Sequence, residues 1–203
     1  MEKTKNNLAK RVVIALASLL ICLTIMGVAV YASVSQNLKL TNSISVTTDG
    51  QAKALISAYE ISLDGNKAVS ELPSEPTWGQ AVVTKEEGED SAEKALTPIV
   101  FSQTTNKNVY AYKIVVTNKS TVPVKVSITS STESNEEIDV YSGTTFAGAT
   151  EVTNTQGVNF QENALAKDGE LTYYIIVCAN KDLVDMTATE NAEPFNIDVV
   201  VEV

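Results

Sequence analysis

The sequence contains no histidine and only two cysteines, Cys22 and Cys178, among 203 residues. Without histidine there is no Ser-His-Asp triad, no Cys-His dyad and no His-ligated zinc, iron or copper. Two cysteines cannot supply the four thiolates of an all-cysteine zinc or iron–sulfur site. Cations are also scarce, because 15 Lys and Arg stand against 25 Asp and Glu, a net charge of −10. This acidic balance argues against nucleic-acid binding, which needs clustered Lys and Arg.

The first 32 residues have the features of an export signal. Four basic residues lie within positions 1–11, and residues 12–30 form a largely apolar run without a charge, about 28 Å long as a helix. Because basic residues stay on the cytoplasmic side of a membrane, we expect the rest of the chain to be exported. Small residues end the run, and we predict signal cleavage between Ala32 and Ser33, with a second candidate site after Ala29.

The alternative is that the signal is not cut. An apolar run of this length can span a bilayer, so residues 12–30 could instead remain as a membrane anchor. In both cases residues 33–203 form a single exported domain. Residues 1–11 carry four positive charges and one negative, so their loss leaves −10 − 3 = −13. Cys178 is the only cysteine of the exported part, which therefore has no intrachain disulfide; we interpret this thiol as a small buried hydrophobe.

The exported part is dominated by alternating apolar and polar residues, the pattern of strands with one buried face. Such stripes occupy residues 195–203, 38–46, 59–63, 110–116 and 122–128. Residues 171–178 are apolar on both faces, which is typical of a central strand covered on both sides. We predict roughly eight to ten strands in an all-β fold, an antiparallel β-sandwich of jelly-roll or immunoglobulin-like type.

Turns and helices are predicted between these stripes. Asp-Gly dipeptides at 49–50, 64–65 and 168–169, and the polar stretch 118–121, are typical of hairpin turns. A capping box at 90–93 predicts one short helix over 91–96, and a second short helix is expected within 182–191. Residues 71–93 are expected to form a long surface loop, and residues 137–163 short strands and loops.

Three stretches carry a resemblance to a known family. The signal ends in Tyr31-Ala32 followed by Ser33-Val34-Ser35. A Val-Val-Thr-Asn segment at 115–118 precedes Val-Pro-Val-Lys-Val at 122–126, and Gly-Glu-Leu-Thr-Tyr-Tyr at 169–174 precedes the last strand. In these features the chain resembles the TasA/camelysin family of Gram-positive bacteria.

The resemblance implies a jelly-roll-like sandwich that is secreted and forms extracellular fibres in the biofilm matrix. It further implies assembly by a mechanism similar to donor-strand exchange. Some members of the family are described as metalloproteases, and the absence of histidine gives no support for that activity here.

The segment 33–46 is the candidate assembly strand. Its apolar stripe consists of Leu38, Leu40, Ile44 and Val46, with Asn42 as the one polar break. At the mature N-terminus such a strand can pair within its own sheet or add to the open edge of a neighbouring subunit. Repeated head-to-tail addition does not close, and so it builds filaments. The sequence leaves both pairings open.

No motif predicts catalysis, a cofactor or a metal site, so we expect a non-enzymatic protein. The acidic stretch 86–90 could hold Ca²⁺, but it lacks the ordered spacing of a calcium loop, and a solvated loop is the preferred interpretation. Four tyrosines within 110–112 and 173–174 could form a sugar-binding surface, although tyrosine is also an ordinary strand residue.

These observations give one main hypothesis and two alternatives. The main hypothesis is a secreted structural subunit of an extracellular matrix or fibre, associating with itself or with other matrix proteins. The first alternative is a cell-surface binding or adhesion module, tethered to the membrane by residues 12–30, that presents loops 71–93 and 137–163. The second is an unrecognised hydrolase that uses a pair of carboxylates.

Overall fold

Thirteen β-strands make up the regular structure of the described residues in the computed structural model. Those residues are 38–40, 42–49, 51–64, 75–86, 91–101, 107–131, 134, 138–153, 157–179 and 195–203. The predicted signal, the cleavage site at Ala32 and Ser33, and the helix predicted within 182–191 lie outside them. The strands belong to one compact unit, residues 37–203.

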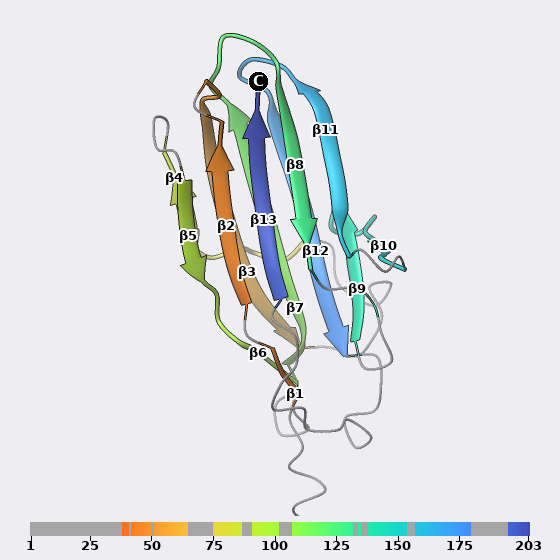
Figure 1. Cartoon of the computed structure of the whole chain (residues 1–203). Coiled ribbons are helices and arrows are strands. Elements are labelled where there is room, and N and C mark those ends of the chain that lie inside the picture. Colours follow the sequence, from red (N-terminus) through yellow and green to blue (C-terminus); the bar gives the residue numbers. More distant parts are fainter. Residues whose placement is uncertain are drawn as a thin grey trace, which may run out of the picture. The chain divides into compact units, whose positions relative to one another are not determined.

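Eleven of the strands form two sheets that face each other (Figure 1). We call the first the front sheet, which has the order β11-β8-β13-β2-β5. Its strands are β11 (Asn159–Leu165), β8 (Val124–Ser130), β13 (Phe195–Glu202), β2 (Asn42–Thr48) and β5 (Ser91–Ala95). The second, the back sheet, has the order β10-β9-β12-β7-β3-β4. Its strands are β10 (Thr150–Glu151), β9 (Ile138–Gly143), β12 (Glu170–Ala179), β7 (Lys107–Asn118), β3 (Ala54–Asp64) and β4 (Val83–Lys85).

A third, small sheet joins β1 (Leu38–Leu40) to β6 (Ile99–Phe101) in antiparallel pairing. Leu40 on β1 and both Ile99 and Phe101 on β6 are buried in the main core. The small sheet therefore continues the apolar stripe of the N-terminal segment before the chain enters β2.

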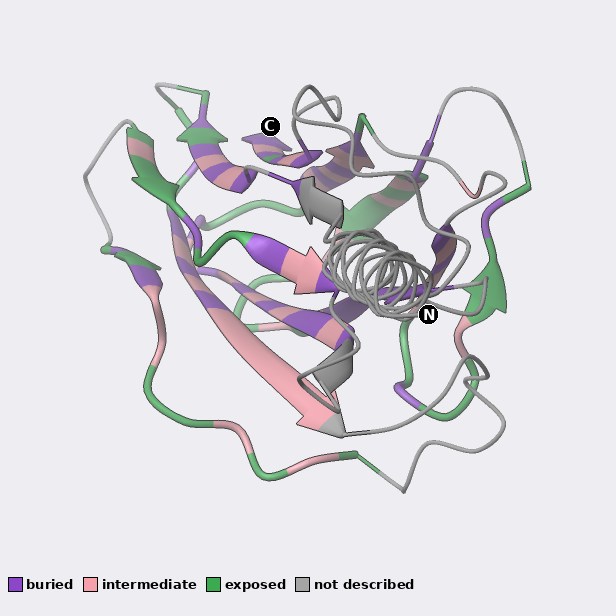
Figure 2. Cartoon of the chain, turned by 90° about the horizontal axis from the view of Figure 1, so that it is seen from below, coloured by how far each residue is buried: buried purple, intermediate pink, exposed green. Residues whose placement is uncertain are grey.

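The main core lies between the two large sheets. Alternate residues of most long strands point into it, as the alternation of buried with intermediate or exposed colours along these strands shows (Figure 2). The fully buried residues of the front sheet include Val126, Ile128, Ile197 and Val199, and those of the back sheet include Ile56, Ile114 and Ile175. These side chains exclude water from both inner faces, so the two sheets form a β-sandwich as the period-two pattern predicted.

The central strand β12 confirms the prediction made from its two apolar faces. It pairs with β7 along its whole length and with β9 at its C-terminal half. Its inner face belongs to the main core, and its outer face joins a second apolar cluster with Val109, Ala111 and Phe146. A strand covered on both sides has no polar face, which explains its uninterrupted apolar sequence.

Several details of the fold differ from the predictions. The described residues contain no helix: β5 occupies Ser91–Ala95, where the capping box predicted a helical turn. Pairing to β2 supplies hydrogen bonds that a single isolated helical turn lacks, so tertiary pairing overrides the local signal. The predicted loop 71–93 contains β4 and the first residues of β5. The strands are also more numerous than predicted, because several have only two or three residues.

The connections predicted as hairpins need a further correction. The stretch 118–121 joins β7 in the back sheet to β8 in the front sheet, and residues 166–169 join β11 in the front sheet to β12 in the back sheet. The turn after β2 likewise leads to β3 in the opposite sheet. Turn residues reverse the chain in either geometry, so the sequence does not distinguish a hairpin from an arch between two sheets.

The last correction concerns strand direction. β2 and β13 pair in parallel, with Ile44 opposite Ile197 and Val46 opposite Val199 (Figure 1). All other strand pairs in the described part of the chain are antiparallel. The first and last long strands of the sandwich therefore lie side by side in the middle of the front sheet.

Candidate assembly strand and its surroundings

The predicted assembly strand is seated in its own subunit. β2 lies between β13 and β5 and pairs with both, so it is an interior strand of the front sheet. Leu40, Ile44 and Val46 are buried in the main core; the side chain of Leu38 lies outside the described residues, although its backbone belongs to β1. The stripe predicted from the sequence thus faces the core of the same chain. Of the two pairings that the sequence left open, this structure has the one within the subunit.

Asn42, the first residue of β2, is the polar exception in this stripe. Its side chain is 5% exposed. The Nδ2 amide donates to the hydroxyl of Tyr112 at 2.6 Å and to the carbonyl of Thr97 at 3.0 Å. Its backbone carbonyl accepts from the amide of Leu96 at 2.9 Å. Asn42 therefore connects the start of β2 to the back sheet and to the segment between β5 and β6.

The carbonyl oxygen of the Asn42 side chain has no hydrogen-bond partner among the described residues. The hydroxyl of Tyr112 is itself buried, and burial raises the pKa of this phenol well above its ordinary value, with the nearby Glu60 carboxylate adding to the effect. The ring of Tyr112 also packs against Phe195 at the start of β13, with centroids 5.4 Å apart. The neutral phenol thus contacts both strands that meet at the start of the β2–β13 pair.

A pocket of about 170 Å³ lies beside this contact, lined by Glu60, Ile61, Ser62, Thr97, Tyr110 and Tyr112. The Glu60 carboxylate accepts from the Thr97 hydroxyl at 2.6 Å and from the Thr97 amide at 3.1 Å. Tyr110 both accepts from the amide of Val100 and donates to its carbonyl. These bonds hold the segment 97–100 against the back sheet, and Thr97 is then in place to accept from Asn42.

On the outer face of the front sheet, a side-chain bond also joins β2 to β13. The hydroxyl of Ser43 donates to Oδ1 of Asn196 at 2.9 Å, and the two residues are partners in the parallel register. This bond joins partners of the same register on the solvent side of the sheet.

The terminal strands of both sheets are short, charged or irregular. β10 and β4, the edges of the back sheet, have two and three residues. β5 at one edge of the front sheet carries Glu93 and Lys94, and Lys94 donates to the carbonyl of Val82 across to the back sheet at 2.8 Å. β11 at the other edge has a bulge between Glu162 and Leu165. Such features discourage edge-to-edge addition of another sheet.

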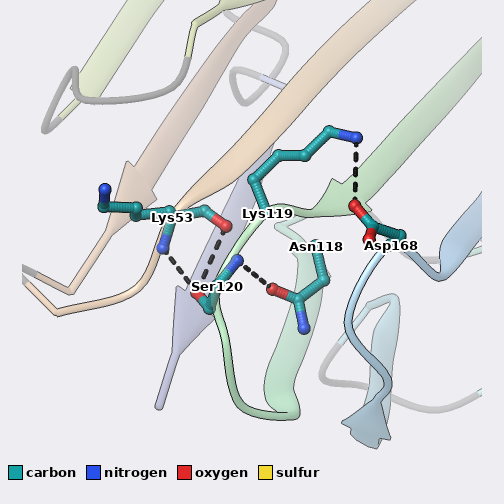
Figure 3. A network of polar contacts seen from close by, with 5 residues as sticks. All are labelled: Lys53, Asn118, Lys119, Ser120 and Asp168. Atoms are coloured by element: carbon teal, nitrogen blue, oxygen red, sulfur yellow. Dashed lines mark hydrogen bonds and ion pairs between the residues drawn. The ribbon is translucent and has the colours of Figure 1, made fainter.

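At the opposite end of β2, a polar network ties three connections together (Figure 3). Asn118 is completely buried; its Nδ2 donates to the carbonyls of Val122 and Leu165 at 2.9 Å each, and its Oδ1 accepts from the amide of Ser120 at 2.7 Å. The hydroxyl of Ser120 in turn accepts from the amide of Lys53 at 2.7 Å. The network thereby joins the arch after β7, the arch before β12 and the turn before β3.

The outer face of the back sheet is covered by the segment that begins at Glu75. Its carboxylate accepts from Nε1 of Trp78 at 3.0 Å and from the ammonium of Lys113 on β7 at 2.8 Å. The Lys113 hydrogen bond is the main reason why the pKa of Glu75 lies below its usual range. Trp78 packs against Phe146 and Tyr174, and burial raises the pKa of Tyr174 to about 12. These contacts hold Glu75 and Trp78 against the outer face of the back sheet.

The four tyrosines for which the sequence offered either a structural role or a sugar-binding surface are parts of the two cores or pack against them. Tyr112, Tyr173 and Tyr174 are buried, and Tyr110 is partly buried and bonded to Val100.

The interpretation of Cys178 as a buried hydrophobe is confirmed: it has no exposed surface, and burial raises the pKa of its thiol to about 12. A thiol with this pKa is protonated, and therefore unreactive, at neutral pH.

The remaining predicted features are only partly described. No cluster of three or more Cys, Asp or Glu with metal-binding geometry occurs in the described ranges, and of the acidic stretch 86–90 they include only Glu86. No helix within these ranges is both long and apolar enough to cross a membrane; residues 12–30 are not among them. Cleavage of the signal stays a prediction, and so does the preference for a solvated loop over a Ca²⁺ site at residues 86–90.

Comparisons with known proteins give no relative. No family model and no curated protein matches the chain. Among solved structures, the chain is similar to a yeast delta-COP-I mu-homology domain, with 7% identity over 83% of this chain and 96% of that one and a TM-score of 0.26. The same domain in complex with a peptide gives 0.25. A GH31 alpha-xylosidase from Xanthomonas citri gives 0.20, with 9% identity over 75% of this chain and 15% of that one. Scores this low carry no argument about function, and the resemblance to the TasA/camelysin family stays a prediction.

Sequence reasoning identified the stripe of β1 and β2 but not its polar contacts. It registered Asn42 only as a break in the apolar pattern. A lone asparagine inside an apolar stripe was the available signal, because a buried amide requires partners. Those partners, Tyr112 and Thr97, come from 70 and 55 residues away in the sequence, so no local pattern identifies them.

Proposed function

We propose that this protein is a secreted, non-enzymatic structural subunit of an extracellular matrix or fibre, and that subunits join by exchanging the segment 33–46. The observation that carries the proposal is the place of β2: a strand near the exported N-terminus is an interior strand of the sandwich, paired on both sides. If β2 is donated to a neighbour, the gap between β13 and β5 must be filled by the equivalent strand of another subunit. Repetition of that step gives a linear polymer.

The condition of the sheet edges supports exchange over simple edge addition. The terminal strands of the described sandwich are short, charged or irregular, which disfavours their extension by a neighbour's strand. An open stretch does exist on β3, because β4 pairs with only Ile56–Ala58 of its eleven residues, but a strand added there would be paired on one side only. The gap left by β2, in contrast, is long, has pairing partners on both sides and has an apolar floor. A strand inserted there recovers the hydrogen bonds and the burial that the donated strand had.

We further infer that the sandwich is of jelly-roll type. Most consecutive strands alternate between the two large sheets, as from β7 to β8, from β8 to β9 and from β11 to β12. This alternation is the arrangement expected of a jelly roll, whereas hairpins within one sheet are the rule in simpler sandwiches.

A reversible disulfide clamp tests the exchange. Ser43→Cys with Asn196→Cys places two thiols at register partners whose native side chains already touch. We expect the exported protein to form filaments in electron microscopy when the clamp is reduced and to stay monomeric when it is oxidised. A wild-type protein that stays monomeric at all concentrations would show the fibre role to be wrong.

The matched control clamps two strands that do not need to separate. Ser127→Cys with Val200→Cys joins β8 to β13 on the same outer face of the front sheet. Oxidation of this pair is expected to leave filament formation unchanged. If both clamps block filaments equally, the effect is one of general rigidity, and exchange of β2 loses its support.

The second candidate function is a cell-surface binding module tethered by residues 12–30. The ordered segment 75–82, fixed over the outer face of the back sheet by Glu75, favours it. The intact mass of the protein recovered from its cells separates the candidates. A mass that begins at Ser33 supports the secreted subunit, and an intact N-terminus supports the tethered module.

A further inference from the structure

Among the described residues from Leu40 to Val46, Asn42 is the only polar one that faces the core. Its neighbours on this face are interchangeable in kind, since each is a branched apolar residue in an apolar environment. Its own position differs, because the Tyr112 hydroxyl and the Thr97 carbonyl converge there on one amide group. The start of β2 thus makes specific buried side-chain hydrogen bonds that the apolar residues of the same face do not make.

The two hydrogen bonds of Asn42 distinguish the observed register of β2 from the nearest alternatives. A slip of β2 by two residues keeps the same side chains on the core face, so alternation alone does not prevent it. Such a slip places Leu40 or Ile44 beside the Tyr112 hydroxyl and moves the Asn42 amide among apolar side chains. The slipped strand then loses two hydrogen bonds and buries an unpaired amide, whereas the apolar contacts are largely retained.

Asn42 also lowers the stability of β2 in the position that it selects between β13 and β5. Its Oδ1 is buried without a partner in the described structure, and a buried unsatisfied acceptor costs free energy that an apolar residue in this place does not. A single buried asparagine that selects one pairing at the expense of stability is an established device in coiled coils.

We propose that Asn42 is the register-determining residue of β2, and that it selects one alignment of the strand while making its seat less stable than an apolar residue would. The inference deepens the proposed function and rests on it for its purpose: a strand that leaves one subunit and enters another must regain a single alignment. The register itself is a property of the monomer and is tested there.

Pairs of introduced cysteines on β2 and β13 report the register directly, because only residues that lie opposite each other can form a disulfide. Ser45 and Asp198 are exposed or partly exposed partners in the parallel pair, so Ser45→Cys with Asp198→Cys reports the native alignment. Ser43→Cys or Thr47→Cys with Asp198→Cys reports a slip of two residues in one direction or the other. Without a slip these last pairs are diagonal, about 7–8 Å apart, which is too far for a disulfide.

In the otherwise native exported protein, only the 45/198 pair is expected to form a disulfide. The double variant Asn42→Leu with Tyr112→Phe removes both polar side chains of this contact and keeps the core apolar, so it is expected to fold. Two hydrogen bonds of about 1 kcal/mol each correspond to about a thirty-fold loss of preference for the native alignment. The 43/198 or 47/198 disulfide should therefore appear in this background.

A second variant and a control keep the test decisive. Asn42→Val, with a smaller side chain, is expected to show the same slipped disulfides. The double variant Asn42→Leu with Tyr112→Phe, which also removes the hydroxyl that the amide bonded, is expected to have a midpoint of urea unfolding no lower than that of the native protein. Thr48→Val changes the other buried polar residue on this face of β2, at its far end, and is expected to keep the single native disulfide. A single register in both Asn42 variants overturns the inference, as does an equal slip in Thr48→Val.

Filament formation is scored separately in the same proteins. If no variant forms filaments and the native protein forms none, the proposed function fails, but the disulfide pattern still decides the role of Asn42. If the native protein forms filaments and the Asn42 variants keep a single register, the proposed function stands and the inference about Asn42 is wrong.

Discussion

Two buried asparagines, Asn42 and Asn118, hold opposite ends of this sandwich in different ways. Asn118 has all its side-chain polar atoms bonded: one acceptor and two donors reach three backbone groups on two arches. Asn42 donates two bonds but leaves its carbonyl oxygen without a partner in the described structure. The first bonds backbone groups where the chain passes between the two sheets, and the second connects β2 to the back sheet and to the segment between β5 and β6. The comparison teaches that burial alone does not tell how strongly a polar residue stabilises its surroundings.

The backbone around Asn118 makes the difference larger. Its amide donates to the carbonyl of Gly169, and its carbonyl accepts from the amide of Asp168, so the two arches are joined through both main chain and side chain. Asp168 adopts a positive φ of 56°, a conformation that aspartate tolerates better than most residues. An ion pair between Lys119 and Asp168 closes the same connection at the surface, with 3.4 Å between the charged atoms (Figure 3).

The largest expected effect is at Asn118. Asn118→Ala leaves the buried Ser120 amide and the partly buried carbonyls of Val122 and Leu165 without their partner. We expect the free energy of unfolding to fall by about 3–5 kcal/mol, since three hydrogen bonds to a completely buried side chain are lost at once. Urea unfolding followed by tryptophan fluorescence measures it. A loss below about 1 kcal/mol would mean that water replaces the amide and that the comparison does not hold.

Alkaline pH should act on the Asn42 end. Burial raises the pKa of Tyr112 in the folded chain, whereas the phenol ionises near pH 10 in the unfolded chain. Above pH 10 the unfolded state therefore binds fewer protons, and the stability of the folded state falls as pH rises. Tyr112→Phe should flatten this fall by about 1.4 kcal/mol per pH unit between pH 10 and 12.

The control for this pH prediction is Asn118→Ala, whose surroundings contain no buried ionisable group among the contacts described. It should keep the alkaline slope of the native protein, although its stability is lower at every pH. The same slope in Tyr112→Phe as in the native protein would show that the phenol opens to solvent before it ionises.

A smaller loss is expected at Asn42. Asn42→Ala removes two donated hydrogen bonds but also removes the unpartnered carbonyl oxygen, so the two changes partly offset each other. We expect a loss of about 1–2 kcal/mol in the free energy of unfolding, clearly less than for Asn118→Ala. Parallel urea titrations of the two variants give the ranking; equal losses would remove the distinction drawn between the two residues.

The smallest effect is expected at the surface of the Asn118 network. Lys119 and Asp168 are 36% and 63% exposed, so their attraction is screened by water and salt. Lys119→Ala should change the free energy of unfolding by no more than about 0.5 kcal/mol, and less in about 1 M salt than in about 0.1 M. A larger, salt-independent loss would place the contribution of Lys119 in its aliphatic stem.

The sequence predicted the strands better than their connections. Period-two stripes identified β2, β7, β8 and β13, because burial of one face between two sheets acts directly on side-chain polarity. A run that is apolar on both faces identified β12, which is covered on both sides. On β3 the stripe 59–63 was recognised, but its inner face is Ala54, Ile56 and Ala58, and Ile61 and Leu63 pack on the outer cluster. Small and large apolar residues on both faces made the two sides of this strand indistinguishable.

The position of the candidate assembly strand in the sheet could not be predicted from local sequence patterns. The apolar stripe of Leu40, Ile44 and Val46 fixes that one face of β2 is buried, because apolar side chains leave water in any arrangement. It does not fix which strands lie on either side. That choice depends on β13 and β5, which come from distant parts of the chain, and on backbone hydrogen bonds that every sequence can make.

By itself the sequence determined an acidic chain without histidine and an all-β domain, most of whose long strands alternate between apolar and polar residues. These follow from composition and local periodicity, which depend only on neighbouring residues. Only the tertiary structure decided that β2 runs parallel to β13, that the connections at 49–50, 118–121 and 168–169 are arches between sheets, and that one buried asparagine is fully bonded while the other is not. Most of these depend on contacts between residues tens to more than a hundred positions apart, where packing and hydrogen-bond geometry, not local preference, set the outcome.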